Sequence, residues 1–171
     1  MALKDLLKHG KRKRNQKLDI DKDYIREHLE DFQRIISYWR KYPDKFVDYL
    51  CSLNPDNQFK FYFSQRIYLR LVMRYRVFYA VFSRGFSKSF LAVMSLMLKC
   101  VLYPGAKVAT VADGKAQSAA ILSSKMQEIC MLIPALANEI VWDTRGKIQQ
   151  TSQSKDSVSF AFRNGLGYWL I

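Results

Sequence analysis

The fold is decided by residues 77–89, which run Val-Phe-Tyr-Ala-Val-Phe-Ser-Arg-Gly-Phe-Ser-Lys-Ser. Residues 77–82 are β-branched or aromatic except for one alanine, and such a run favours a short strand buried on both faces. Residues 83–87 favour a turn, and Lys88 and Ser89 open an apolar helix that is expected to end near residue 102, before Pro104 and Gly105. The stretch therefore predicts a strand, a turn and a helix in that order.

The elements after this stretch repeat the same order. A second strand is expected at residues 107–112 and a second helix at residues 115–132. Alternating strands and helices are typical of a parallel sheet with right-handed crossovers. Residues 158–162 and 167–170 flank Arg163-Asn164-Gly165, and Asn-Gly is typical of a β-hairpin because both residues tolerate positive φ.

The part before residue 77 is expected to be helical. Apolar residues recur at steps of three and four between residues 21 and 42, which predicts an amphipathic helix with one buried stripe. Pro43 interrupts the pattern, because proline disfavours helical geometry in the residue before it. Two further helices are expected at residues 44–53 and 59–74.

Composition limits the class of protein. The chain has 171 residues, of which 49% are hydrophobic, and a formal net charge of +13. One core is expected, together with a polyanionic partner or a solvated basic surface. Three widely spaced cysteines without a CxxC pair argue against a disulfide framework or a zinc site and fit a reducing cytoplasm. The sequence shows no apolar run of about 20 residues and no signal peptide, so neither a membrane span nor secretion is expected.

Residues 1–20 form an expected flexible basic arm with little to bury. Its candidate DNA-binding residues are Lys11, Arg12, Lys13 and Arg14. The same run is also compatible with a localisation signal or with simple solvation, and only binding measured against salt separates these interpretations.

Residues 77–102 contain the parts of a phosphate-binding loop in order. Such a loop needs a buried strand, a tight turn with inward amides and a helix N-terminus, with Lys on the phosphates and Ser or Thr on Mg²⁺. The strict pattern GxxxxGK[ST] fails, because Phe82 and Ser87 stand at its glycine positions and only Lys88-Ser89 matches. An ordinary strand, turn and helix with an incidental Lys-Ser is the alternative.

The segment at residues 83–89 resembles the divergent Walker A loop of terminase large subunits, the DNA-packaging ATPases of tailed bacteriophages and prophages. The resemblance implies that Lys88 binds phosphate, that Ser89 binds Mg²⁺ and that Arg84 is a catalytic finger on the γ-phosphate. The remaining nucleotide-binding residues of the loop are Ser83, Gly85, Phe86 and Ser87. Ser87 departs from the family, which usually has glycine before the lysine.

Three further segments are similar to that family in kind and order. Residues 61–66 resemble its adenine-reading segment, which implies that Gln65 bonds the edge of adenine; the alternative is a polar residue on the exposed face of a helix. Residues 109–118 resemble the strand and helix that follow the loop. Residues 160–165 resemble its Phe-x-Asn-Gly hairpin.

The resemblance implies an incomplete α/β, P-loop NTPase-like fold, with a mainly parallel sheet flanked by helices, a helical N-terminal region and a C-terminal β-hairpin. The expected parts are the arm at 1–20, the helical region at 21–76 and a partial ATPase core at 77–171. The implied cofactors are ATP and Mg²⁺. The implied partners are double-stranded DNA, the portal protein, the small terminase subunit and, for a full-length form, further copies of the chain in the cytoplasm of a bacterial host.

Hydrolysis by this chain alone is not expected, because no strand ending in Asp-Glu follows Lys88. Two other functions stay open. One is a helicase-like nucleic-acid motor, which shares the order of the segments. The other is a non-enzymatic DNA-binding module that uses residues 11–17 together with Arg66, Arg70, Arg74 and Arg76.

Overall fold

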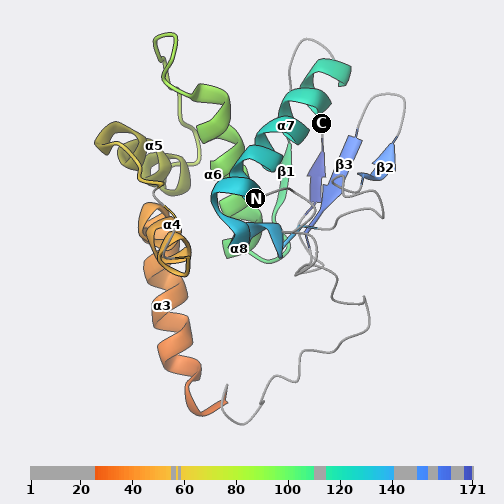
Figure 1. The fold of residues 1–171 in the computed structure, drawn as a ribbon. Coiled ribbons are helices and arrows are strands. Elements are labelled where there is room, and N and C mark those ends of the chain that lie inside the picture. Colours follow the sequence, from red (N-terminus) through yellow and green to blue (C-terminus); the bar gives the residue numbers. More distant parts are fainter. Residues whose placement is uncertain are drawn as a thin grey trace.

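The computed structural model describes residues 26–54, 57, 59–109, 115–140, 150–153, 158–162 and 168–170 (Figure 1). The helices are α3 (Leu29–Lys41), α4 (Pro43–Ser52), α5 (Phe63–Arg74), α6 (Lys88–Leu102), α7 (Lys115–Leu132) and α8 (Pro134–Ala137). The strands are β1 (Lys107–Ala109), β2 (Gln150–Gln153), β3 (Val158–Ala161) and β4 (Tyr168–Leu170).

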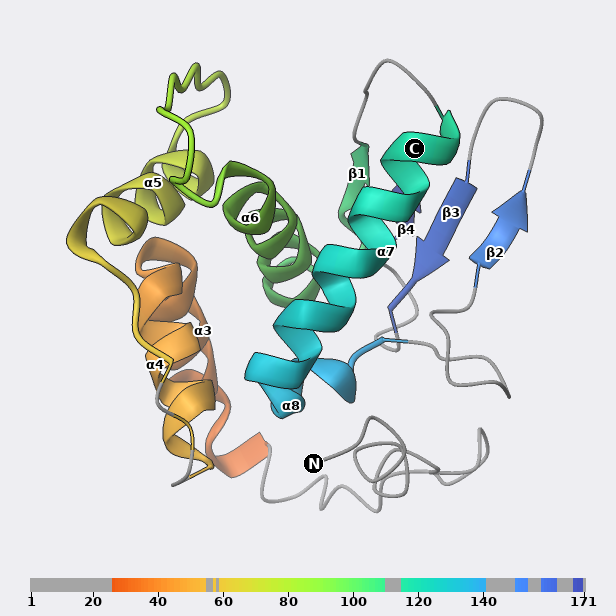
Figure 2. The ribbon, with the colours of Figure 1, turned by 45° about the horizontal axis from the view of Figure 1, so that its top comes forward.

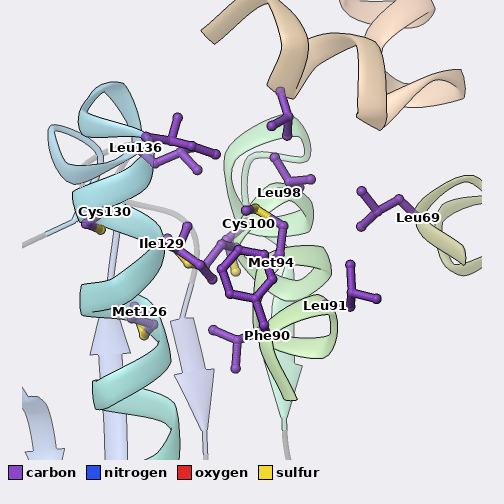
Figure 3. Close-up of a cluster of buried hydrophobic side chains, with 14 of the residues drawn as sticks. Leu69, Phe90, Leu91, Met94, Leu98, Cys100, Met126, Ile129, Cys130 and Leu136 are labelled. Carbon is purple, nitrogen blue, oxygen red and sulfur yellow. The ribbon is translucent and has the colours of Figure 1, made fainter. Parts of the chain in front are cut away.

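Helix α6 lies at the centre of the fold, with α5 on one side and α7 on the other (Figure 2). Its apolar residues point in every direction and nine of its side chains are buried, because neighbours cover it from both sides. Leu69 of α5 approaches the side of α6 that carries Leu91, while Ile129 of α7 lies on the opposite side (Figure 3). The α4, α5, α6, α7 and α8 helices thus share one hydrophobic core.

The expected mainly parallel P-loop sheet is wrong. The described residues are mostly helical, and the strands are three or four residues long. The strand order is β1-β4-β3-β2, in which only β1 and β4 pair in parallel. The other two pairs, β2 with β3 and β3 with β4, are antiparallel.

Residues 77–82, the strand expected to carry the loop, do not form a strand. Val77, Tyr79 and Val81 are 86%, 88% and 78% exposed. A strand buried on both faces needs a hydrogen-bonded neighbour and a covering layer, and the described part of the chain brings neither to this segment. Residues 77–82 are of types that favour strands, but a strand also needs a neighbouring strand to which its backbone can hydrogen-bond.

Several local expectations agree with the structure. Helices α6 and α7 occupy residues 88–102 and 115–132 as expected, and α3, α4 and α5 lie in the region before residue 77 where helices were expected. β1 covers residues 107–109 of the expected strand at 107–112, whose last three residues lie outside the described ranges. β3 and β4 pair antiparallel where the hairpin was expected, although its turn is outside the described residues.

Helix α3 differs from the expected helix with a buried stripe, because it buries none of its residues. Its apolar side chains Leu29, Phe32, Ile35 and Ile36 are between 38% and 48% exposed. Its closest packing is near its C-terminal end, where Trp39 contacts the rings of Phe46 and Tyr49 at 4.8 and 5.2 Å. No helix among the described residues is long and apolar enough to cross a membrane.

Candidate functional site

The candidate loop lies between α5 and α6, where the chain projects beyond both helices (Figure 1). Tyr68 of α5 packs against residues 78–82. Its ring centroid lies 5.7 Å from that of Phe78 and 5.4 Å from that of Phe82. The Phe82 ring stacks on that of Phe86 at 4.4 Å and 10°. These aromatic contacts draw residues 82–86 into a compact turn directly before α6.

The backbone of this turn has two left-handed positions. Gly85 has φ 85°, and Ser87, the N-cap of α6, has φ 59° and ψ 37°. Ser87 is the one non-glycine residue with positive φ in the described ranges. The position where the resembling family usually has glycine therefore adopts the conformation that glycine favours, despite the cost of a Cβ atom there.

The side chain of Lys88 lies against the start of the turn that precedes it. Its Nζ atom lies 3.5 Å from the carbonyl oxygen of Phe82, which brings the ammonium group to the open end of the turn. Ser89 and Arg84 are both exposed nearby in sequence. No acidic residue occurs between Asp56 and Asp113 in the sequence, so the loop carries cationic side chains without a neighbouring carboxylate along the chain.

The N-terminus of α6 has open amides. Among the residues that the structure describes, no side chain caps this helix, and Leu91 N donates a backbone hydrogen bond to Ser87 O at 3.0 Å. Amides of a first helical turn and the helix dipole both favour a bound anion. The candidate loop is thus a cationic turn at a helix N-terminus, without the expected strand before it. Its residues are Ser83, Arg84, Gly85, Phe86, Ser87, Lys88 and Ser89.

Gln65 has a structural role in its own helix. It lies in the first turn of α5, and its Oε1 accepts a hydrogen bond from Tyr62 N at 3.0 Å. Within the described part of the chain, no hydrogen bond joins Gln65 to the turn before α6. Contact with adenine through Oε1 would require this capping bond to break. The candidate DNA-binding residues Lys11, Arg12, Lys13 and Arg14 lie outside the described ranges.

Two arginines assigned to a possible DNA-binding face instead join α4 to α5. Arg70 donates to both oxygens of Asp44, from Nε at 2.8 Å and from Nη2 at 2.7 Å. Arg66 donates to Asp48 at 2.6 and 2.8 Å and to Asp44 at 3.2 Å. Arg66 and Arg70 are therefore engaged with carboxylates, which reduces the positive charge that they offer to a DNA partner.

The α4–α5 ion pairs were missed by the sequence analysis, although a signal was present. Asp44 and Asp48 are spaced by four residues on one expected helix, as are Arg66 and Arg70 on the next. Such spacing places each pair on one helical face, so two packed helices can bring the four groups together. The matching spacing of the acidic and the basic pair is therefore the sequence signal for these ion pairs.

Burial and charge oppose each other at Asp44, whose side chain is fully buried. Burial raises the pKa of this carboxyl group, but the hydrogen bonds and charge of Arg70, with a hydrogen bond from Arg66, outweigh it and leave the pKa below 3.8. The hydrogen bonds from Arg66 to Asp48 raise the pKa of the Arg66 guanidinium. The shifts at Asp44 and Arg66 thus both favour the charged form of the group.

Metal binding and thiol chemistry are two further possibilities that the ionisable groups of the described residues allow us to examine. In the described ranges, no three His, Cys, Asp or Glu residues are grouped so that they could hold a metal ion. All three cysteines are buried, and burial raises the pKa of Cys100 to about 11 and that of Cys130 to about 12. These thiols are therefore poor nucleophiles in the folded chain.

Comparison with known proteins gives no match to a protein-family model, a curated protein or a solved structure.

Proposed function

We propose that residues 83–89 bind the phosphates of ATP and that the chain supplies the nucleotide-facing part of a DNA-packaging motor of the terminase large-subunit kind. The observation that supports this most is the backbone of the turn. Ser87 is left-handed, the amides at the start of α6 are open, and Lys88 lies over the turn. Local loop geometry supports nucleotide binding without requiring the parallel sheet that was expected around it.

Each residue of the turn has a distinct part in this proposal. Lys88 supplies a point charge to the β- and γ-phosphates, and the exposed hydroxyl of Ser89 is suited to Mg²⁺. Arg84, which is also exposed, offers a guanidinium to the γ-phosphate. The backbone of Ser83, Gly85, Phe86 and Ser87 surrounds the phosphates. Gln65 would contact adenine only after releasing Tyr62 N.

The wider setting follows from the same proposal. A packaging motor acts on double-stranded DNA, and its partners are a portal protein, a small terminase subunit and further copies of the full-length chain. Its place is the cytoplasm of a bacterial host. The net charge of +13 suits a DNA partner.

Binding of a fluorescent ATP analogue in the presence of Mg²⁺ tests the proposal. Lys88→Ala should weaken binding by at least about tenfold, since it removes a cation from the phosphates. Lys60→Ala is the matched control, because Lys60 is an exposed lysine on the segment before α5. Equal effects of the two variants, or no binding by the original chain, would contradict a phosphate-binding role for residues 83–89.

Steady-state hydrolysis is a separate matter from binding. Phosphoryl transfer to water needs an acidic residue on the metal and a group that orients the water. The sequence places no carboxylate within the segment from residue 57 to residue 112. We expect turnover by the purified chain to equal the rate without protein, and Lys88-dependent phosphate release would contradict this.

A basic nucleic-acid-binding module is the second candidate. Arg74, Arg76 and Arg84 are exposed, and none of them makes an ion pair within the ranges that the structure describes. This candidate predicts DNA binding that weakens with salt but is unchanged by ATP or by Lys88→Ala. Measuring DNA affinity with and without ATP therefore separates it from the motor proposal.

A further inference from the structure

The segment from residue 77 to residue 81 has the side-chain arrangement of a strand without a strand partner. Val77, Tyr79 and Val81 are at least 78% exposed, whereas Phe78 is 37% exposed and contacts Tyr68; Ala80 is exposed as well. A partly covered Phe78 between the outward Val77 and Tyr79 is the arrangement that an extended backbone produces. The outward side chains are β-branched or aromatic, the types that pack well on a pleated surface.

The backbone of this segment is also unpaired. Among the described residues, no hydrogen bond involves a backbone N–H or C=O group of residues 77–81. Unpaired groups along an extended segment can accept a further strand, as in peptide recognition by strand addition. Tyr68 contacts both Phe78 and Phe82, so α5 already holds the segment at two points.

The charged residues on either side of residues 77–81 indicate which kind of strand can bind there. Arg74 and Arg76 precede it, and Arg84 and Lys88 follow it. A second copy would bring these cations against the same cations of its partner and would add to the repulsion between two chains of charge +13. A strand with carboxylates at its ends would instead meet opposite charge at both ends.

We infer that residues 77–81 bind an extended strand of a protein partner that has a β-branched core flanked by acidic residues. Main-chain hydrogen bonds supply the attachment, Val77, Tyr79 and Val81 supply the apolar contact, and the flanking arginines select the acidic partner. This inference does not require nucleotide binding, although two of its flanking cations, Arg84 and Lys88, belong to the proposed phosphate site.

A synthetic peptide with a core of valine, threonine and tyrosine and two aspartates at each end tests the inference. We expect binding that protects every second amide of residues 77–81 from hydrogen exchange, because one edge of a strand presents alternate amides. A matched peptide with lysines in place of the aspartates should bind at least about tenfold more weakly at low salt. Equal affinity for the two peptides, or binding without amide protection, would overturn the inference.

Variants of the chain locate the site. Tyr79→Pro should weaken peptide binding at least about tenfold, because proline removes a backbone donor without disturbing a buried side chain. Phe63→Ser is the control, since Phe63 is an aromatic residue of similar exposure outside the segment. A loss of binding in Phe63→Ser equal to that in Tyr79→Pro would overturn the assignment. So would protection of the same amides by self-association without peptide, which would make a second copy the occupant.

Discussion

Ser87 illustrates how one backbone position can differ from the preference of its residue. Its φ of 59° lies in the left-handed region, where a Cβ atom is disfavoured, and it is followed at once by α6. Replacing Ser87 with glycine should therefore raise the free energy of unfolding by about 0.5–1 kcal/mol in urea denaturation.

Ser89→Gly is the matched control for that measurement. Ser89 lies in the first turn of the same helix, where glycine should lower the free energy of unfolding by about 0.5–1 kcal/mol. Two changes of the same chemistry, two residues apart, are thus expected to have opposite signs. A destabilising Ser87→Gly would show that the left-handed geometry is absent in solution.

Asp44 is the residue whose loss should matter most to stability. Asp44→Asn removes the fully buried anion that Arg66 and Arg70 share, and we expect a loss of about 1–3 kcal/mol in the free energy of unfolding, because water reaches Arg70, which is 40% exposed, and offsets part of the loss. Asp31→Asn is the control, because Asp31 and Arg34 are 65% and 77% exposed and such pairs contribute less than about 1 kcal/mol. Equal losses in the two variants would contradict the buried ion pair.

The pKa of Asp44 predicts a pH dependence with a definite sign. The folded pKa lies below the ordinary value of 3.8, so the stabilisation is present above that value and is lost as pH falls through the folded pKa. Unfolding midpoints of the original chain and of Asp44→Asn should therefore differ at neutral pH and converge below about pH 4. A gap that stays constant down to acid pH would contradict the linkage.

At the scale of elements, helices α6 and α7 and the short strands β1, β3 and β4 were predictable from sequence, and the strand expected at residues 77–82 was not. The apolar run of α6 and its end before Pro104 and Gly105 are local signals, because a helix satisfies its backbone within itself. Residues 77–82 have equally clear strand chemistry, but a strand needs a neighbour that sequence spacing cannot supply. The same limit applies to α3, whose amphipathic pattern predicted a buried stripe, although none of its residues is buried and its ring contacts to α4 are made by Trp39 near its C-terminal end.

The candidate site was predictable in part for the same reason. Lys88, Ser89 and the turn before them are contiguous in sequence, and the structure brings them together at the start of α6. Other contacts could not be read from the motifs. Gln65 caps α5 through Tyr62 N, and Arg66 and Arg70 pair with Asp48 and Asp44. Assigning a polar residue to a ligand therefore requires knowing its protein partners first.

Thiol chemistry should report on the packing of α6 against α7. Cys100 and Cys130 are 0% and 2% exposed, and burial raises the pKa of both thiols. We expect neither to react with a thiol reagent at about pH 8 until urea unfolds the chain. Rapid modification of the native chain, followed by mass spectrometry of the labelled site, would contradict the central position of α6.

At the scale of the whole molecule, the net charge and the exposed apolar side chains favour different classes of partner. The net charge of +13 favours polyanions, and we expect affinity for duplex DNA to fall steeply as salt rises from about 50 to 200 mM. The exposed apolar side chains of α3 and of residues 77–81 favour protein partners instead. DNA affinity that is insensitive to salt would contradict an electrostatic surface.

The position of β4 between β1 and β3 affects the order in which the chain can fold. β1 precedes α7 and α8, whereas its partner β4 follows both of these helices and also β2 and β3. During synthesis, the helices from α3 to α8 can pack before β4 has been made, and β1 is without its parallel partner until then. Because pairing between distant residues is slow, closure of the sheet is expected to be the last and slowest step, after the helical core has formed.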